Sequence, residues 1–173
     1  LHRTAVIAYF FMLREIELSL MLLESVTVEI ETKIVRILLP ASKTDPAALS
    51  CTRYWGCVCD EGATPEEDKC PYHAALVQKE KLQEAFGDGV LADGFTFAPR
   101  PDGGTVSKQQ MVKSIQRTAQ VAGLQLKDEE GRDIHTGHIF RIGGTRHMLK
   151  HGVSVPPIMV LARWDSHCVL RYA

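Results

Sequence analysis

The sequence lacks an apolar run long enough to cross a membrane, because Arg14, Glu15 and Glu17 interrupt its opening apolar stretch. It contains no internal repeat, no low-complexity tract and no cleavage-type signal ahead of its first structural pattern. The 173 residues, 45% hydrophobic and 24% charged, are about one domain's worth of chain. This composition predicts a soluble globular core and argues against disordered, collagenous and coiled-coil chains.

A large excess of charge of one sign is also missing. The net charge is −1, which by itself gives no indication of a nucleic-acid partner. The charges are unevenly distributed, however: residues 134–173 carry +4 and five of the seven histidines, whereas the first 133 residues carry −5. Two interpretations of the basic C-terminal part remain open at this point, an anion-binding face and a solvated helix face.

The periodicity of the apolar residues predicts mostly helices and one small sheet. Alternation favours a β-hairpin of strands 25–30 and 33–39, with a third strand at 50–55. Residues 87–104 are expected to form a loop, extended at 94–98. Helices are expected at 6–23, 71–86 and 107–122, after the turn at 134–137, and from Pro156 to 161. The fold class is therefore α+β, mainly helical, with a small antiparallel three-stranded sheet near the N-terminal side.

The richest functional segment follows residue 137. His138 and Arg141 lie three residues apart and so share one face of a helix, while Gly143-Gly144 allows a backbone or a phosphate to approach closely. Trp164 and Tyr172 follow. Arginine donates in a planar fork that suits phosphate oxygens, and tyrosine can act as a covalent nucleophile. This combination would suit a phosphodiester.

These residues resemble the motifs of the tyrosine recombinase (phage integrase) family, whose catalytic domain carries Arg, Lys, His-x-x-Arg, His or Trp, and Tyr in that order. The residues in these motifs are most similar to those of eukaryotic, dinoflagellate-type integrase-like sequences. The resemblance covers residues 14–172, and the catalytic set that it implies is Arg14, Lys43, His138, Arg141, Trp164 and Tyr172. Simpler roles remain open: Arg14 could pair with Glu17, and Trp164 could only pack in the core.

The resemblance implies a DNA breaking and rejoining reaction without a catalytic metal or nucleotide. Tyr172 would attack the scissile phosphate and form a 3′-phosphotyrosine intermediate, while the two arginines grip the nonbridging oxygens. Lys43 would protonate the leaving oxygen, His138 would assist proton transfer, and the Trp164 indole would donate to a phosphate oxygen. The expected enzyme is a site-specific recombinase or integrase of a mobile element.

The family resemblance also sets expectations about context. Double-stranded DNA is the expected partner, with a homotetramer forming on it in the full-length protein, and the expected location is intracellular, nuclear in a eukaryote. Residues 1–173 are expected to be a fragment, a single catalytic domain that could be inactive alone, because the chain starts close to Arg14 and stops one residue after Tyr172. Two alternatives remain: a catalytically silent DNA-binding relic, and a zinc-stabilised protein-interaction module.

A second candidate site lies in a Cys/His-rich insertion at about 51–73. Three thiols and one imidazole fall within 17 residues and could close a tetrahedral structural zinc site: Cys57, Cys59, Cys70 and His73. Cys51 is an alternative ligand, and Cys168 is expected to be buried filler. The competing interpretations are reduced thiols in an intracellular loop, or a disulfide in a secreted protein.

Overall fold

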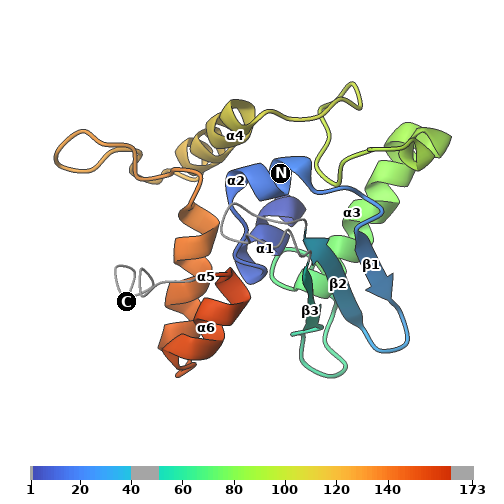
Figure 1. Ribbon diagram of the computed structural model, residues 1–173, viewed down its shortest axis with the longest axis horizontal. Helices are drawn as coiled ribbons and strands as arrows, with labels where there is room; N and C mark the ends of the chain where they lie inside the picture. The colour runs from blue at the N-terminus through green and yellow to red at the C-terminus, as the bar shows by residue number, and fades with distance from the viewer. Residues whose placement is uncertain (1, 40–50, 165–173) are drawn as a thin grey trace.

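The computed structural model describes residues 2–39 and 51–164, and in this part of the chain most elements are helices (Figure 1). In chain order they are α1 (His2–Phe10), α2 (Glu15–Leu20), β1 (Val26–Glu29), β2 (Ile34–Leu39), β3 (Cys51–Gly56), α3 (Pro71–Phe86), the 3₁₀ helix η1 (Gly87–Leu91), α4 (Lys108–Val121), α5 (Ile139–Lys150) and α6 (Val155–Ala162). The expected α+β class is confirmed. No described helix combines the length and apolarity that a membrane span requires.

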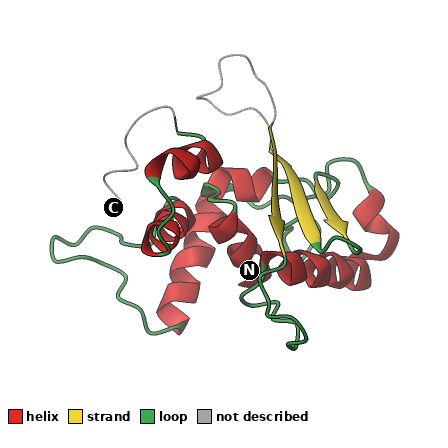
Figure 2. Ribbon diagram, turned by 90° about the horizontal axis from the view of Figure 1, so that it is seen from below, coloured by secondary structure: helices red, strands yellow, loops and turns green. Residues whose placement is uncertain are grey.

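The three strands form one antiparallel sheet in the order β1-β2-β3, which confirms the expected hairpin and third strand. Val28 pairs with Val35, and Val35 in turn pairs with Trp55. The alternation in β2 buries Val35, Ile37 and Leu39. Helix α3 runs beneath this sheet (Figure 2) and contacts all three strands, so the buried face of β2 belongs to the main core.

The expected single helix at 6–23 is wrong, because the chain breaks between α1 and α2. Met12 adopts a left-handed backbone conformation with φ 48°, and Arg14 is extended at the start of α2. Phe11, Met12 and Leu13 are all buried. An apolar run buried on every side gives no helical periodicity, so it could not reveal the turn. The break places Arg14 at a helix N-terminus.

Helix α5 packs closely against α1, and its paired glycines make this possible. A Cβ atom on Gly144 would lie 2.5 Å from the backbone oxygen of Tyr9, and one on Gly143 would lie 2.9 Å from the Tyr9 ring. The close approach that these glycines allow is therefore made by α1, whose backbone and side chain already occupy the space expected for a phosphate. This packing brings residues far apart in the sequence, in α1 and α5, into contact.

The remaining helices follow the expected pattern, apart from η1. Ser107 caps α4 by accepting a hydrogen bond from the Gln110 amide at 3.2 Å, and Met111, Ile115 and Ala119 form its buried stripe. The loop expected at 87–104 contains η1, which was not predicted. Its extended part is held to residues 21–23 by backbone hydrogen bonds of 2.8 Å.

Candidate functional site

The side chain of Arg141 lies inside the protein, between α5 and the turn that joins α1 to α2. It is 3% exposed, and its Nε donates to the carbonyl oxygen of Met12 at 2.9 Å. Its Nη2 donates to Oε2 of Glu17 at 3.3 Å. A buried guanidinium is costly without an anionic partner, and Glu17 supplies that partner from the same chain.

The backbone of Arg14 meets the same carboxylate. The Arg14 amide donates to Oε2 of Glu17 at 2.7 Å, while its side-chain Nε is buried and has no hydrogen-bond partner among the described residues. The described ion pairs of Glu17 are with Arg141 and Arg163. The ion pair between the Arg14 side chain and Glu17 that the sequence left open is not among them. Two of the expected catalytic residues therefore converge on one carboxylate.

Arg163 and Trp164 complete this region from the end of α6. Arg163 Nη2 lies 2.5 Å from Oε1 of Glu17. The Trp164 ring centroid lies 5.8 Å from Cζ of Arg141, within cation–π distance. We call Arg14, Glu17, Arg141 and Arg163 the arginine cluster. The guanidiniums of Arg141 and Arg163 share the one carboxylate of Glu17, so this group of side chains has a net positive charge, which suits an oxyanion.

His138 lies beside this cluster at the first turn of α5. It is the N-cap residue of α5, and its imidazole is exposed. The Glu15 amide donates to the Gly137 carbonyl at 3.1 Å, which ties the start of α2 to the start of α5. The expected Lys43 and Tyr172 lie outside the described residues.

Two members of the cluster were missed as site residues from the sequence. Glu17 follows Arg14 by three positions, a spacing that is common in helices and therefore weak evidence. Its contact with Arg141 depends on the packing of α5 against α1, which no local pattern encodes. For Arg163, the only feature of the sequence that could have indicated a role in the site was its position next to Trp164.

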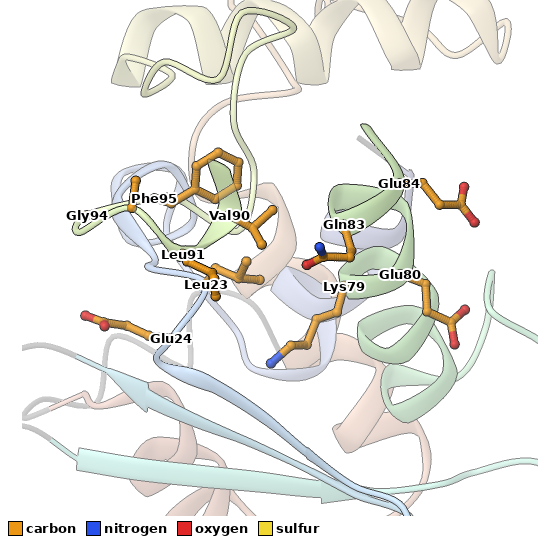
Figure 3. A pocket seen from close by; sticks show the side chains of 11 residues that line it. Leu23, Glu24, Lys79, Glu80, Gln83, Glu84, Val90, Leu91, Gly94 and Phe95 are labelled. Carbon is orange, nitrogen blue, oxygen red and sulfur yellow. The ribbon is translucent and has the colours of Figure 1, made fainter. Parts of the chain in front are cut away.

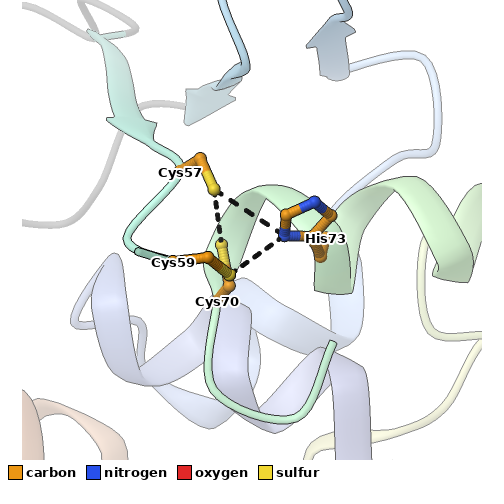
Figure 4. Close-up of side chains that lie close together, drawn as sticks. All are labelled: Cys57, Cys59, Cys70 and His73. Carbon is orange, nitrogen blue, oxygen red and sulfur yellow. Dashed lines mark hydrogen bonds between the residues drawn. The ribbon is translucent and has the colours of Figure 1, made fainter. Parts of the chain in front are cut away.

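The four residues of the predicted metal site come together and form the cysteine cluster: Cys57, Cys59, Cys70 and His73 (Figure 4). Their ligand atoms all lie within 4.8 Å of one another. Sγ of Cys57 lies 3.7 Å from Sγ of Cys70 and 3.8 Å from Nδ1 of His73. A tetrahedron with metal–sulfur bonds of ~2.3 Å has edges of about 3.8 Å. The cluster is therefore close enough to bind a metal.

The local fold explains this arrangement. Cys57 directly follows β3, where its amide donates to the Lys33 carbonyl at 2.9 Å. Cys70 is the N-cap residue of α3, and His73 lies in the first turn of that helix. Cys51, the alternative ligand, starts β3 opposite Leu39 and is not part of the cluster.

The ionisation of His73 favours a bound cation, whereas that of Cys59 opposes it. Burial lowers the pKa of His73, as does nearby Lys33, so the imidazole keeps a lone pair at neutral pH. The Glu66 backbone favours the Cys59 thiolate, but burial and the thiols of Cys70 and Cys57 outweigh it and raise the pKa of Cys59 to about 11. A cation that binds here would displace the proton of the Cys59 thiol.

A separate pocket of about 730 Å³ lies between α3 and the segment around Phe95 (Figure 3). Apolar residues such as Leu23 and Val90 line it, together with the charged side chains of Lys79 and Glu80. Nζ of Lys79 donates to the Val26 carbonyl at 2.8 Å. No member of the arginine or cysteine cluster lines this pocket.

The sequence matches no protein-family profile and no curated protein. Among solved structures, it is similar to the XerH site-specific recombinase bound to a palindromic difH substrate in a post-cleavage complex, with TM-score 0.68 and 14% identity over 99% of this chain. The pre-cleavage complex of XerH with difH gives TM-score 0.64 and 14% identity over 98% of this chain.

The chain spans 40% of the XerH chain in both comparisons. At 14% identity the similarity to XerH describes the fold. It does not support the expected similarity of the motifs to eukaryotic, dinoflagellate-type sequences. The chain therefore has a tyrosine recombinase fold, in which Arg14 and Arg141 contact Glu17 and Trp164 lies beside Arg141.

Proposed function

We propose that this chain is the catalytic domain of a DNA breaking and rejoining enzyme, a site-specific recombinase or integrase of a mobile element. The observation that carries the proposal is the convergence of the Arg14 backbone amide and the Arg141 guanidinium on Glu17, with Trp164 beside Arg141. The recombinase fold of the chain supports it independently. In this proposal the Cys/His-rich part at about 51–73 is an insertion in that domain.

The arginines bind the nonbridging oxygens of the scissile phosphate and stabilise the charge that develops on them. The Tyr172 oxygen forms a bond to phosphorus as the bond to the 5′ oxygen breaks, and Lys43 gives that oxygen its proton. His138, at the exposed start of α5, takes the phenolic proton. Trp164 donates its indole N–H to the phosphate. The reverse steps rejoin the DNA without an external energy source.

Double-stranded DNA is the proposed partner, bound by a homotetramer in the full-length protein. The XerH structures of similar fold contain difH DNA. The net charge of +4 in residues 134–173 favours contact with phosphates in this part of the sequence. We propose a nuclear location for a eukaryotic, dinoflagellate-type protein of this kind.

A suicide duplex tests the proposal. The 173-residue chain is incubated with nicked duplexes carrying randomised spacers, and covalent adducts are separated on a denaturing gel. We expect an adduct for the wild type and for Tyr54→Phe, whose side chain is exposed. Tyr172→Phe should give none while still binding duplex. An adduct formed by Tyr172→Phe, or none formed by the wild type, would contradict the proposal; salt-sensitive binding without an adduct would favour the silent relic.

We also propose that the cysteine cluster binds one structural zinc ion, because its ligand types and spacing fit a tetrahedral site. Zinc would tie the end of β3 to the start of α3, without a part in catalysis. Metal analysis of protein purified without chelator should find one zinc per chain. Cys70→Ser should lose it and Cys51→Ser should keep it. Wild-type protein without stoichiometric zinc would refute the site, whereas zinc in a protein without DNA affinity would favour an interaction module.

A further inference from the structure

Arg163 adopts a backbone conformation that arginine rarely uses. Among the described residues, three other than glycine have positive φ: Met12 at 48°, Lys33 at 51° and Arg163 at 56°. Lys33 lies in the turn between β1 and β2, where such conformations are common. The Met12 carbonyl accepts a hydrogen bond from Arg141, and Arg163 itself belongs to the arginine cluster. Arg163 is the C-cap residue of α6, where a left-handed residue commonly ends a helix, although glycine is the usual residue there.

The side chain of Arg163 uses this conformation to reach Glu17. It is 13% exposed, and its Nη2 lies 2.5 Å from Oε1 of the carboxylate. The other oxygen, Oε2, accepts from the Arg14 amide and from Nη2 of Arg141. Glu17 is therefore held on one side by Arg163 and on the other by the two residues that would bind a phosphate.

This arrangement has an electrostatic consequence for Arg141. A carboxylate paired with Arg141 alone would cancel its charge and repel an incoming phosphate. Arg163 supplies a second guanidinium to the same carboxylate, so the three side chains together keep one positive charge in a site with little exposure to water. The surplus charge is what an oxyanion would meet.

We propose that Arg163 is a positioning residue of an oxyanion site, acting through Glu17. It compensates this carboxylate and fixes its orientation, so that Arg141 stays in place and its charge is available to a phosphodiester. The phosphodiester in this statement rests on the function proposed above; the oxyanion site itself can be tested without DNA.

Glycine is the most informative replacement. Arg163→Gly removes the guanidinium and also relieves the left-handed backbone, so a loss of function would not reflect a strained fold. Arg163→Asn tolerates the same backbone but carries no charge, whereas Arg163→Lys restores a cation. Arg117→Gln removes one positive charge from the exposed face of α4 and serves as the control for net charge.

The first measurement is stabilisation by tungstate, a tetrahedral oxyanion that mimics phosphate. Tungstate should raise the unfolding midpoint of the wild type and of Arg117→Gln alike. Arg163→Gly and Arg163→Asn should remain folded and bind tungstate about tenfold more weakly, a loss of ~1.4 kcal/mol. Arg163→Lys should recover part of the affinity. The second measurement is the rate of adduct formation on the suicide duplex, which should fall at least about tenfold in Arg163→Gly.

Wild-type affinity for tungstate in Arg163→Gly would overturn the inference, and so would a wild type that tungstate does not stabilise. An unchanged adduct rate in Arg163→Gly would overturn it while leaving the recombinase function intact. If the wild type forms no adduct but tungstate binding still depends on Arg163, the recombinase function fails and the oxyanion site stands.

Discussion

The arginine cluster and the cysteine cluster are built on opposite principles. In the first, the guanidiniums of Arg141 and Arg163 and the backbone amide of Arg14 meet Glu17, a counter-charge that the chain itself provides. The second gathers three thiols and an imidazole, and these four side chains include no cation to balance three thiolates. The first can fold without a ligand and still attract an anion, whereas the second needs a cation to be complete.

The two clusters also differ in how far apart their members lie in the sequence. The cysteine cluster comes from residues 57–73, around the end of β3 and the start of α3. The arginine cluster joins α2 to α5 and to the end of α6. Removal of a bound metal should therefore destabilise the cysteine cluster, and removal of the Glu17 carboxylate should destabilise the arginine cluster.

Removing the metal should have the largest effect. The zinc-loaded protein is expected to lose about 4 kcal/mol or more on chelation, if zinc is present at a thousand times its dissociation constant. For a chain of this size, this corresponds to a fall of roughly 10 °C in the unfolding midpoint. Differential scanning calorimetry with and without EDTA measures it, and Cys51→Ser should respond like the wild type. If EDTA left the unfolding midpoint of the zinc-loaded protein unchanged, the cysteine cluster would not depend on its metal for stability.

Removing the internal counter-charge should come next. Glu17→Ala leaves two largely buried guanidiniums without their carboxylate, and we expect the free energy of unfolding to fall by about 3 kcal/mol. Urea denaturation measures the change. Glu24→Ala is the matched control, because Glu24 is exposed, and its effect should stay within ~0.5 kcal/mol. A Glu17→Ala protein as stable as this control would mean that the cluster needs no internal anion.

The smallest effect concerns His147, which lies between the two regions and contacts Tyr9 and His151. Burial lowers its pKa, as do His151 and Lys150, so the folded protein binds this proton less readily than the unfolded chain. Its contribution to stability is therefore complete above the unfolded pKa of ~6.5 and declines as the pH falls below it. Of the other groups around it, Tyr9 has a raised pKa and Lys69 lines the same pocket.

His147→Gln should flatten the decline of the unfolding midpoint from about pH 7 to pH 5 by a few degrees at most. His2→Gln, at an exposed position near the N-terminus, should leave the profile unchanged. Identical pH profiles for the wild type and His147→Gln would show that the protonation of His147 does not affect stability in this range.

The same contrast explains what the sequence could predict. The strands, α3, the cap of α4 and the cysteine cluster depend on local periodicity, turn residues and short spacings, and they were predicted correctly. The break at Met12 and the contact of Gly144 with α1 depend on what packs against them, and they were not. Of the arginine cluster, the motif identified Arg14 and Arg141, but the role of Glu17 as their common partner required the tertiary fold.

A crystal structure of the chain grown with tungstate would test the central claim most directly. That claim is that arginines from distant parts of the sequence form one binding site for a phosphate. Anomalous scattering locates tungsten without ambiguity. We expect one tungstate within hydrogen-bond distance of the guanidiniums of Arg14 and Arg141, with Glu17 still paired to Arg163. An arginine cluster without tungstate in crystals that bind it elsewhere would contradict the account.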